Sequence, residues 1–149
     1  MGEVATKAYV VATRQELDES EALLGAVYEG LGQNIIENCG PIELGRMVRV
    51  FLVDSDGKAV GGIDGLAFGG WMYIKVLWVA SDLRNQGHGG RLLARLEEEA
   101  VRLGCRNAHV DTYSFEARPF YEKHGYETFA TLDEFPPGHQ KHFLSKRLA

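Results

Sequence analysis

Seven stretches of the chain carry the short apolar runs, or the alternation of apolar and polar residues, that predict β-strands. The predicted strands are residues 4–11, 48–53, 59–68, 71–80, 108–112, 126–132 and 142–148. The stretch 71–80 is almost entirely apolar, which is typical of a strand buried on both faces. Turn sequences at 54–57 and 68–70 join the second, third and fourth strands into an antiparallel meander.

Apolar residues at helical spacing predict helices between these strands. The clearest helix is 89–103, which Gly104 ends as a C-cap. An earlier helix begins after a capping box at 13–16, and we expect it to end in the glycine-bearing segment 30–32. The residues that this earlier helix directs inward are Leu17, Ala22, Leu23, Leu24, Val27 and Tyr28.

Two shorter helices complete the pattern. Pro41 opens one that runs through Leu44 and Met47, and the other is 117–124. The resulting order, β-α-α-β-β-β-α-β-α-β-β, predicts an α+β fold on a single mixed, mostly antiparallel sheet flanked by helices. We find no internal boundary, so residues 1–149 are expected to form a single domain.

Composition narrows the class of protein. With 45% hydrophobic residues, the chain has enough apolar material for a buried core. A net charge of −5 argues against nucleic-acid binding, which needs a clustered basic face. Neither a signal peptide nor a membrane span is apparent, so we expect a cytoplasmic protein without membrane contact. Cys39 and Cys105 are too few for a disulfide framework, and we expect both in the core.

Half of the 18 glycines lie between residues 57 and 90. Clustered glycine indicates tight turns or backbone that comes close to a ligand. The last group, at 87–90, follows a buried strand and opens an amphipathic helix. The first N–H groups of a helix have no intrahelical partner and the helix dipole favours an anion there, so this segment predicts a phosphate or pyrophosphate site.

Three ligand classes use such a site. The nucleotide P-loop sequence is absent. A dinucleotide would explain Gly87-x-Gly89 with Asp111 some 22 residues later, but Leu92 holds the third-glycine position and only 38 residues follow Asp111. The third class is the pyrophosphate of coenzyme A.

Two segments resemble the GNAT superfamily of N-acetyltransferases. The sequence at 84–89, Arg-Asn-Gln-Gly-His-Gly, is similar to the signature [RQ]-x-x-G-x-[GA] of that superfamily. Residues 117–126 resemble its A-x-x-[LF]-Y-x-x-x-G-[FY] segment, and the resemblance covers roughly 48–132.

The resemblance implies a three-layer α/β GNAT fold and an N-acetyltransferase domain over 1–149. It further implies acetyl-CoA as cosubstrate, no metal, and a primary amine on a small molecule or a protein as acceptor. A homodimer through an exposed sheet edge is consistent with the sequence but not established by it.

The resemblance also assigns roles to residues. A neutral amine attacks the thioester directly, and Tyr121 matches the tyrosine that acts as general acid toward the departing thiolate. Backbone amides of the signature loop bind the pyrophosphate, and the splayed strand binds pantetheine. The coenzyme-binding residues implied are Leu77, Trp78, Val79, Arg84, Asn85, Gln86, Gly87, His88, Gly89, Gly90, Ser114, Ala117 and Phe120.

Two departures from the family pattern leave the general base open. Ser114 stands where many relatives have asparagine, and Lys75 stands where many have an acidic residue. Asp111 has the best location for a base, on the strand beside the splayed one. Asp64, Glu134 and a water chain are the alternatives.

Two histidines near the C-terminus form the sequence H-x-x-H. His139 and His142 lack further ligands nearby in sequence, so we do not expect a metal site. His139 either contacts the acceptor or is a surface residue. Two other protein classes fit less well: a non-catalytic acyl-CoA-binding module, suggested by Lys75 and Ser114, and an NAD(P)-binding protein.

Substitutions at two groups of glycines are expected to have different effects, one on coenzyme binding and the other on stability. A bulky residue at Gly87 or Gly89 is expected to abolish acetyl-CoA binding while the fold survives. At Gly62 or Gly65 it is expected to act through stability.

Overall fold

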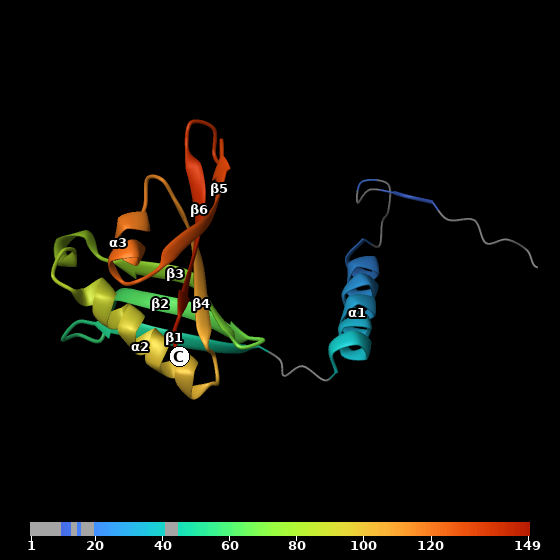
Figure 1. Cartoon of the computed structure of the whole chain (residues 1–149), viewed down its shortest axis with the longest axis horizontal. Coiled ribbons are helices and arrows are strands. Elements are labelled where there is room, and N and C mark those ends of the chain that lie inside the picture. Colours follow the sequence, from blue (N-terminus) through green and yellow to red (C-terminus); the bar gives the residue numbers. More distant parts are fainter. Residues whose placement is uncertain (1–9, 13–14, 16–19, 41–44) are drawn as a thin grey trace, which may run out of the picture. The chain divides into compact units, whose positions relative to one another are not determined.

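A computed structural model describes residues 10–12, 15, 20–40 and 45–149 of the chain. It contains two compact units, 1–42 and 43–149, and each is considered by itself (Figure 1). None of the helices in these described parts is long and apolar enough to cross a membrane.

The N-terminal unit contains α1 (Ser20–Cys39). The expectation that this helix ends at its glycines is wrong, because it continues through Gly30 and Gly32. Each such glycine costs about 1 kcal/mol relative to alanine, and the intervening leucine and following glutamine are good helix formers. The helix ends instead at Gly40, whose φ of 78° is left-handed and whose N–H donates to the carbonyl of Ile36 at 2.9 Å. No residue of α1 is buried, so the expected inward-facing stripe is not formed within this unit.

Some sequence expectations fall outside the described residues. They are 4–9 of the first strand, the capping residues Thr13 and Glu16, Leu17 of the expected inward-facing stripe, and 41–44 of the short second helix. Val10 and Val11, at the end of the expected first strand, lie in no regular element. Met47 belongs to a strand rather than to that helix.

The second unit is built on a six-stranded sheet with the spatial order β1-β2-β3-β4-β6-β5. Its strands are β1 (Arg46–Val53), β2 (Ala59–Phe68), β3 (Trp71–Val79), β4 (Asn107–Tyr113), β5 (Glu127–Asp133) and β6 (Gln140–Arg147). The β3–β4 pair is parallel and the other four neighbouring pairs are antiparallel. From residue 46 onward the predicted element order is confirmed. A doubly wound parallel sheet, which the dinucleotide interpretation needs, is excluded by these pairings.

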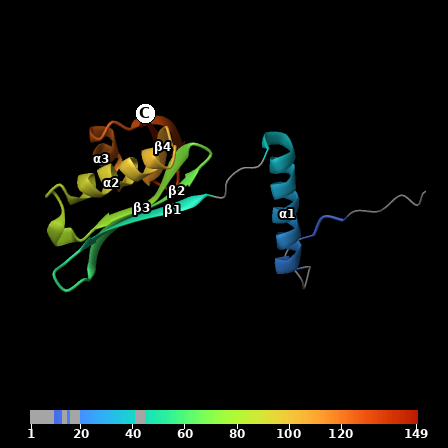
Figure 2. The same ribbon diagram turned by 90° about the horizontal axis from the view of Figure 1, so that it is seen from below.

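Two helices, α2 (His88–Arg102) and α3 (Arg118–Lys123), lie on the same face of this sheet (Figure 2). The stripe of α2 provides Leu92, Leu93, Leu96 and Ala100 to the core, as its spacing predicts. Tyr121 of α3 joins the same cluster, together with inward-facing residues of the central strands. The opposite face of the sheet, which we call the open face, carries none of the helices of this unit.

Glycines in β2 allow close packing against neighbouring elements, which are β3 and α2 at Gly65 and β1 at Gly62. A Cβ atom on Gly65 would lie 2.7 Å from Met72 Sδ and 3.2 Å from Leu96 Cδ1. One on Gly62 would lie 3.2 Å from the carbonyl oxygen of Val50. These glycines serve packing, as the sequence predicts.

The sheet opens between β3 and β4. Their pairing runs from Trp71↔Asn107 to Ile74↔Val110 and stops there. A β-bulge follows at once, since Asp64 of β2 pairs with Val76 and the next residue of β2 pairs with Ile74. Bulges bend a strand and increase its twist, so β3 turns away from β4 beyond this point. The gap that results is the splay expected from the sequence.

Cysteine placement differs between the two units. Cys105 is buried, and burial raises the pKa of its thiol. Cys39 is exposed, so the expectation of a core position is wrong for it.

Candidate active site

The chain between β3 and α2 presents a row of backbone N–H groups without partners. A short 3-10 turn, η2 (Ser81–Leu83), closes when the N–H of Arg84 donates to Ser81 at 3.4 Å. The next backbone N–H that donates is that of Arg91, to the carbonyl of Gly87 at 3.1 Å. Within the described part of the chain, the six N–H groups of residues 85–90 therefore donate to nothing.

The backbone conformation of this loop suits an anion. Asn85 has φ 59° and Gly87, the N-cap of α2, has φ 82°. Left-handed residues interspersed with ordinary ones turn successive N–H groups toward a common point, which is the geometry of an anion-binding nest. No side chain caps the helix at Gly87 and no acidic residue stands in its first turn, so the positive end of the dipole is left for a ligand.

Side chains around the loop are consistent with this role. Arg84 Nε donates to the carbonyl of Val79 at 3.0 Å, and Gln86 Nε2 donates to the carbonyl of Asp82 at 3.0 Å. Nδ1 of His88 is buried and has no hydrogen-bond partner among the residues described. A buried polar atom of this kind needs a partner, which a water molecule, an ion or a ligand can supply. The loop therefore fits a phosphate-bearing group.

The backbone of β3 adds polar groups that face the gap. The N–H of Ala80 donates to Val60 of the neighbouring chain segment at 2.9 Å. In an antiparallel strand the backbone N–H and C=O groups of successive residues point to opposite sides. The backbone groups of Trp78 therefore point toward β2, and those of Leu77 and Val79 point toward the gap. This is the arrangement expected for pantetheine, with the Leu77 and Val79 side chains packed on the core. Trp78 is exposed on the open face.

The structure explains in different ways why residues 87, 89 and 90 are glycine. At Gly87 a Cβ would meet nothing within 4 Å, but the positive φ strains any other residue. A Cβ on Gly89 would lie 3.3 Å from the ring of Phe120, and one on Gly90 would lie 2.8 Å from Nε2 of His124. At these two positions the missing side chain lets α2 pack against α3, whereas their N–H groups remain free for a ligand.

Tyr121 lies in α3 and belongs to the core cluster between the helices and the sheet. Its side chain is buried, and its hydroxyl makes no hydrogen bond to any described residue. Burial raises its pKa well above the ordinary tyrosine value, and the carboxylates of Glu116 and Asp111 raise it further. The phenol is therefore protonated at neutral pH, and its O–H is not engaged by any described residue.

Asp111 is the first residue of β4 beyond the last β3–β4 pair. It lies on the open face and both of its oxygens are engaged. The hydroxyl of Tyr73 donates to Oδ2 at 2.9 Å, and Lys141 Nζ lies 3.1 Å from Oδ1. Burial and the bond to Asp111 raise the pKa of Tyr73, so this hydroxyl stays protonated. The ring of His109 stacks on Tyr73 at 4.8 Å and holds it in place.

The two other carboxylates considered as bases have different surroundings. Asp64 lies between two cations, 3.2 Å from Arg49 Nε and 3.8 Å from Lys75 Nζ. The lysine at the position of the family's acidic residue is thus an ion-pair partner. Glu134 folds back on its own loop and accepts a hydrogen bond from the N–H of Gly138 at 3.1 Å. Of these three carboxylates, only Asp111 contributes to the raised pKa of Tyr121.

Three more predicted residues have local partners. Ser114 Oγ accepts from the N–H of Gln140 at 3.1 Å and lies 3.4 Å from His139 Nδ1. The N–H of Ala117 donates to Thr112 Oγ1 at 3.3 Å, which sets the start of α3. Phe120 lies against the first turn of α2.

The H-x-x-H histidines face different groups. His139 rests edge-on against Phe115, with ring centroids 4.9 Å apart. His142 is buried, with Nδ1 2.9 Å from Thr131 Oγ1 and Nε2 3.5 Å from Arg118 Nη1. Neither arrangement brings the two imidazoles to a common ligand.

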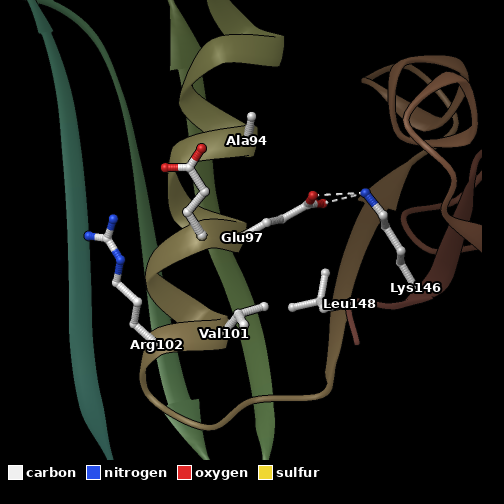
Figure 3. Close-up of a pocket in the computed structure, with 7 residues that line it drawn as sticks. Ala94, Glu97, Val101, Arg102, Lys146 and Leu148 are labelled. Atoms are coloured by element: carbon white, nitrogen blue, oxygen red, sulfur yellow. Dashed lines mark hydrogen bonds and ion pairs between the residues drawn. The ribbon is translucent and has the colours of Figure 1, made fainter.

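A separate hollow of about 540 Å³ lies beside the second half of α2 (Figure 3). Glu97 and Lys146 form an ion pair across it at 2.8 Å, and the hydroxyl of Tyr126 also donates to Glu97 at 2.9 Å. These contacts fasten α2 to β6. The hollow is lined by residues of the second half of α2 and the C-terminal end of the chain, and by none of the loop residues 85–90.

Comparison with known proteins agrees with this geometry. Residues 17–126 match the acetyltransferase (GNAT) family. A blasticidin-S acetyltransferase of Streptomyces morookaense is 38% identical over 93 residues, which cover 62% of this chain and 68% of that protein. An acetyltransferase of Agrobacterium fabrum is 33% identical over 102 residues, which cover 68% of this chain and 74% of that protein. The chain therefore belongs to the GNAT family of acetyltransferases.

Solved structures show the same fold. A crystal structure of an acetyltransferase from Bacillus cereus has a TM-score of 0.77 and 31% identity, and covers 95% of this chain and 97% of its own. A Bacillus anthracis structure, described as a streptothricin acetyltransferase in complex with acetyl coenzyme A, has a TM-score of 0.60 at 18% identity. It covers 68% of this chain and 62% of its own.

Sequence reasoning missed the residues around Asp111. Tyr73, His109 and Lys141 reach one another only because β3, β4 and β6 are neighbours. A signal was present in β4, where His109 and Asp111 alternate with Ala108 and Val110 and therefore share one face of the strand. Nothing in the sequence shows that these residues lie close together in the fold.

Proposed function

We propose that this protein transfers the acetyl group of acetyl-CoA to a primary amine by direct attack of the amine. The observation that carries the proposal is the row of six unbonded N–H groups at 85–90, which follows the part of β3 that has left β4. Acetyl-CoA supplies an activated acetyl thioester when it is bound. The loop N–H groups hold its pyrophosphate, and the free backbone groups of Leu77 together with the free N–H of Val79 hold the chain that follows.

Proton transfer falls to two residues. Asp111 accepts one proton from the acceptor ammonium, which leaves a neutral amine able to form the new C–N bond while the C–S bond breaks. Tyr121 donates its phenolic proton to the departing sulfur and recovers a proton from the nitrogen of the product. The proton on Asp111 is released to solvent, so the step yields one amide, one thiol and one proton.

Two measurements test the proposal. Calorimetric titration with acetyl-CoA measures binding at the loop, and thiol release across a panel of primary amines measures transfer. Binding with amine-dependent thiol release is the expected result. Binding without transfer to any amine would instead identify a non-catalytic acyl-CoA-binding module, and absence of binding would overturn the proposal altogether.

A further inference from the structure

Three aromatic rings and a carboxylate surround one ammonium group on the open face. Lys141 Nζ lies 5.4 Å from the ring centroid of Tyr113, 5.0 Å from that of Phe135 and 5.6 Å from that of Phe143. All three distances are within the range of about 6 Å over which a ring attracts a cation. Asp111 Oδ1 completes the set at 3.1 Å. We call Asp111 with these three rings the ammonium cage.

The cage is a preformed site rather than a chance surface contact. Its members come from the end of β4, the loop after β5 and the strand β6, so the fold brings them together. The ring of Tyr113 also meets that of Phe135 edge-on, with centroids 5.9 Å apart, which fixes two walls against each other. The side chain of Lys141 is only 18% exposed, so its ammonium is held inside the cage.

The position of the cage connects it to the reaction. Asp111 is the first β4 residue beyond the pairing with β3, so the cage begins where the gap opens. The charge of Asp111 also contributes to the raised pKa of Tyr121, which places the two residues within electrostatic reach across that gap. An acceptor amine must lie here to meet both groups.

We infer that the ammonium cage binds the protonated amine of the acceptor, and that Lys141 holds this place in the free protein. The inference rests on the proposed function, because it specifies the acceptor of that reaction. The side chain of Lys141, which occupies the cage in the free protein, indicates the class of substrate. It is a primary ammonium at the end of an unbranched alkyl chain. A free alkylamine and a lysine side chain of a peptide share this chemistry. The acceptor displaces Lys141 and takes over its contacts, which frees Asp111 Oδ1 to receive a proton.

Nuclear magnetic resonance tests the displacement directly. The ε-methylene protons of Lys141 lie among ring faces and are expected to resonate upfield of other lysines. Titration with n-butylammonium should return them to ordinary shifts, whereas neutral n-butanol should not. A lysine-containing tetrapeptide serves as the second probe, and the probe that acts at lower concentration identifies the source of the amine. If neither probe moves these protons, or if n-butanol moves them equally, the inference is wrong.

Variants test whether Lys141 competes with the acceptor amine for the cage or only stabilises the fold. The dissociation constant of n-butylammonium is read from the ring-proton shifts of Tyr113 and Phe135. Lys141→Met removes the internal competitor and should tighten binding about tenfold, whereas Lys141→Arg should not. Asp111→Asn should weaken binding about tenfold or more. Unchanged or weaker binding in Lys141→Met, with the ring signals of a folded protein, would overturn the inference. These titrations do not depend on acetyl transfer, so their failure is distinguishable from failure of the proposed reaction.

Discussion

At the scale of single residues, environment decides what each polar group can do. Tyr121 and Tyr73 are both tyrosines with raised pKa values, but Tyr73 donates to Asp111 and Tyr121 donates to no described residue. Only the second has a hydroxyl that no described residue engages, as the proposed general acid requires. The motif in the sequence predicts Tyr121 as the acid, and that role stays a prediction.

Replacement of Tyr121 tests its role as acid. Tyr121→Phe removes the hydroxyl and keeps the buried ring, so we expect kcat to fall about a hundredfold. The dissociation constant of acetyl-CoA should stay within twofold of wild type, or about 0.4 kcal/mol. Steady-state kinetics and calorimetry measure the two quantities. An unchanged kcat would remove Tyr121 from the mechanism, and Tyr73→Phe serves as the matched loss of a hydroxyl elsewhere.

Gly65 provides a test of packing without chemistry. In Gly65→Ala the new Cβ would meet Met72 Sδ at 2.7 Å and the backbone oxygen of Tyr73 at 3.2 Å. Overpacking of this kind costs about 1–3 kcal/mol of the free energy of unfolding. Urea denaturation should show this loss, while acetyl-CoA affinity per folded molecule stays unchanged. A stable variant that no longer binds acetyl-CoA would contradict the purely structural role.

At the scale of elements, the first turn of α2 serves two purposes at once. Its N–H groups donate to no described residue and so suit the proposed ligand, and its glycine Cα atoms face α3. The sequence indicated the first purpose through the signature at 84–89. It could not indicate the second, because nothing in the local pattern shows that Phe120 and His124 lie against Gly89 and Gly90.

Mutants can separate the packing role of the first turn of α2 from its proposed role in ligand binding. Gly90→Ala should destabilise the fold by about 1–2 kcal/mol, because its Cβ would lie 2.8 Å from His124 Nε2. The double variant Gly90→Ala/His124→Ala should lose less stability than the sum of the two single variants, since the second change removes the clash. Thermal denaturation of the four proteins measures this coupling. Strict additivity would contradict the packing role of Gly90.

Gly87 should behave differently, because it has open space and a φ of 82°. Asparagine tolerates the left-handed conformation better than β-branched residues do. We therefore expect Gly87→Val to weaken acetyl-CoA binding at least tenfold more than Gly87→Asn, or about 1.4 kcal/mol. Calorimetric titration of the two folded variants decides the point. Equal affinities would mean that the loop conformation does not depend on Gly87.

At the scale of the whole C-terminal unit, one cluster joins α2, α3 and the strands. Tyr121 and Tyr126 both lie in it, and their rings meet edge-on with centroids 5.6 Å apart. Burial raises the pKa of both, and for Tyr126 the neighbouring Glu97 raises it further. The stability of the unit is thereby linked to the protonation of two phenols.

This linkage predicts alkaline unfolding. Above pH of about 10 an unfolded tyrosine loses its proton, whereas the folded one keeps it. The unfolded state then binds fewer protons, so the free energy of unfolding falls as pH rises, by about 1.4 kcal/mol per pH unit for each tyrosine. Tyr126→Phe should reduce this slope, as measured by urea denaturation at several alkaline pH values. An unchanged slope in Tyr126→Phe would contradict a buried, proton-retaining Tyr126.

The sequence alone determined the order of the elements from residue 46 onward and the glycine-rich start of α2, because both depend on local signals. Period-two and helical spacing set the strands and helices, and free N–H groups belong to any helix that begins as this one does. The extent of α1 was mispredicted, because glycine is only a weak helix breaker. The tertiary structure alone decided where β3 leaves β4, what Gly89 and Gly90 face, and which groups surround Asp111. Those features depend on register and on which strands are neighbours, and contacts between distant residues leave no periodic trace in a single sequence.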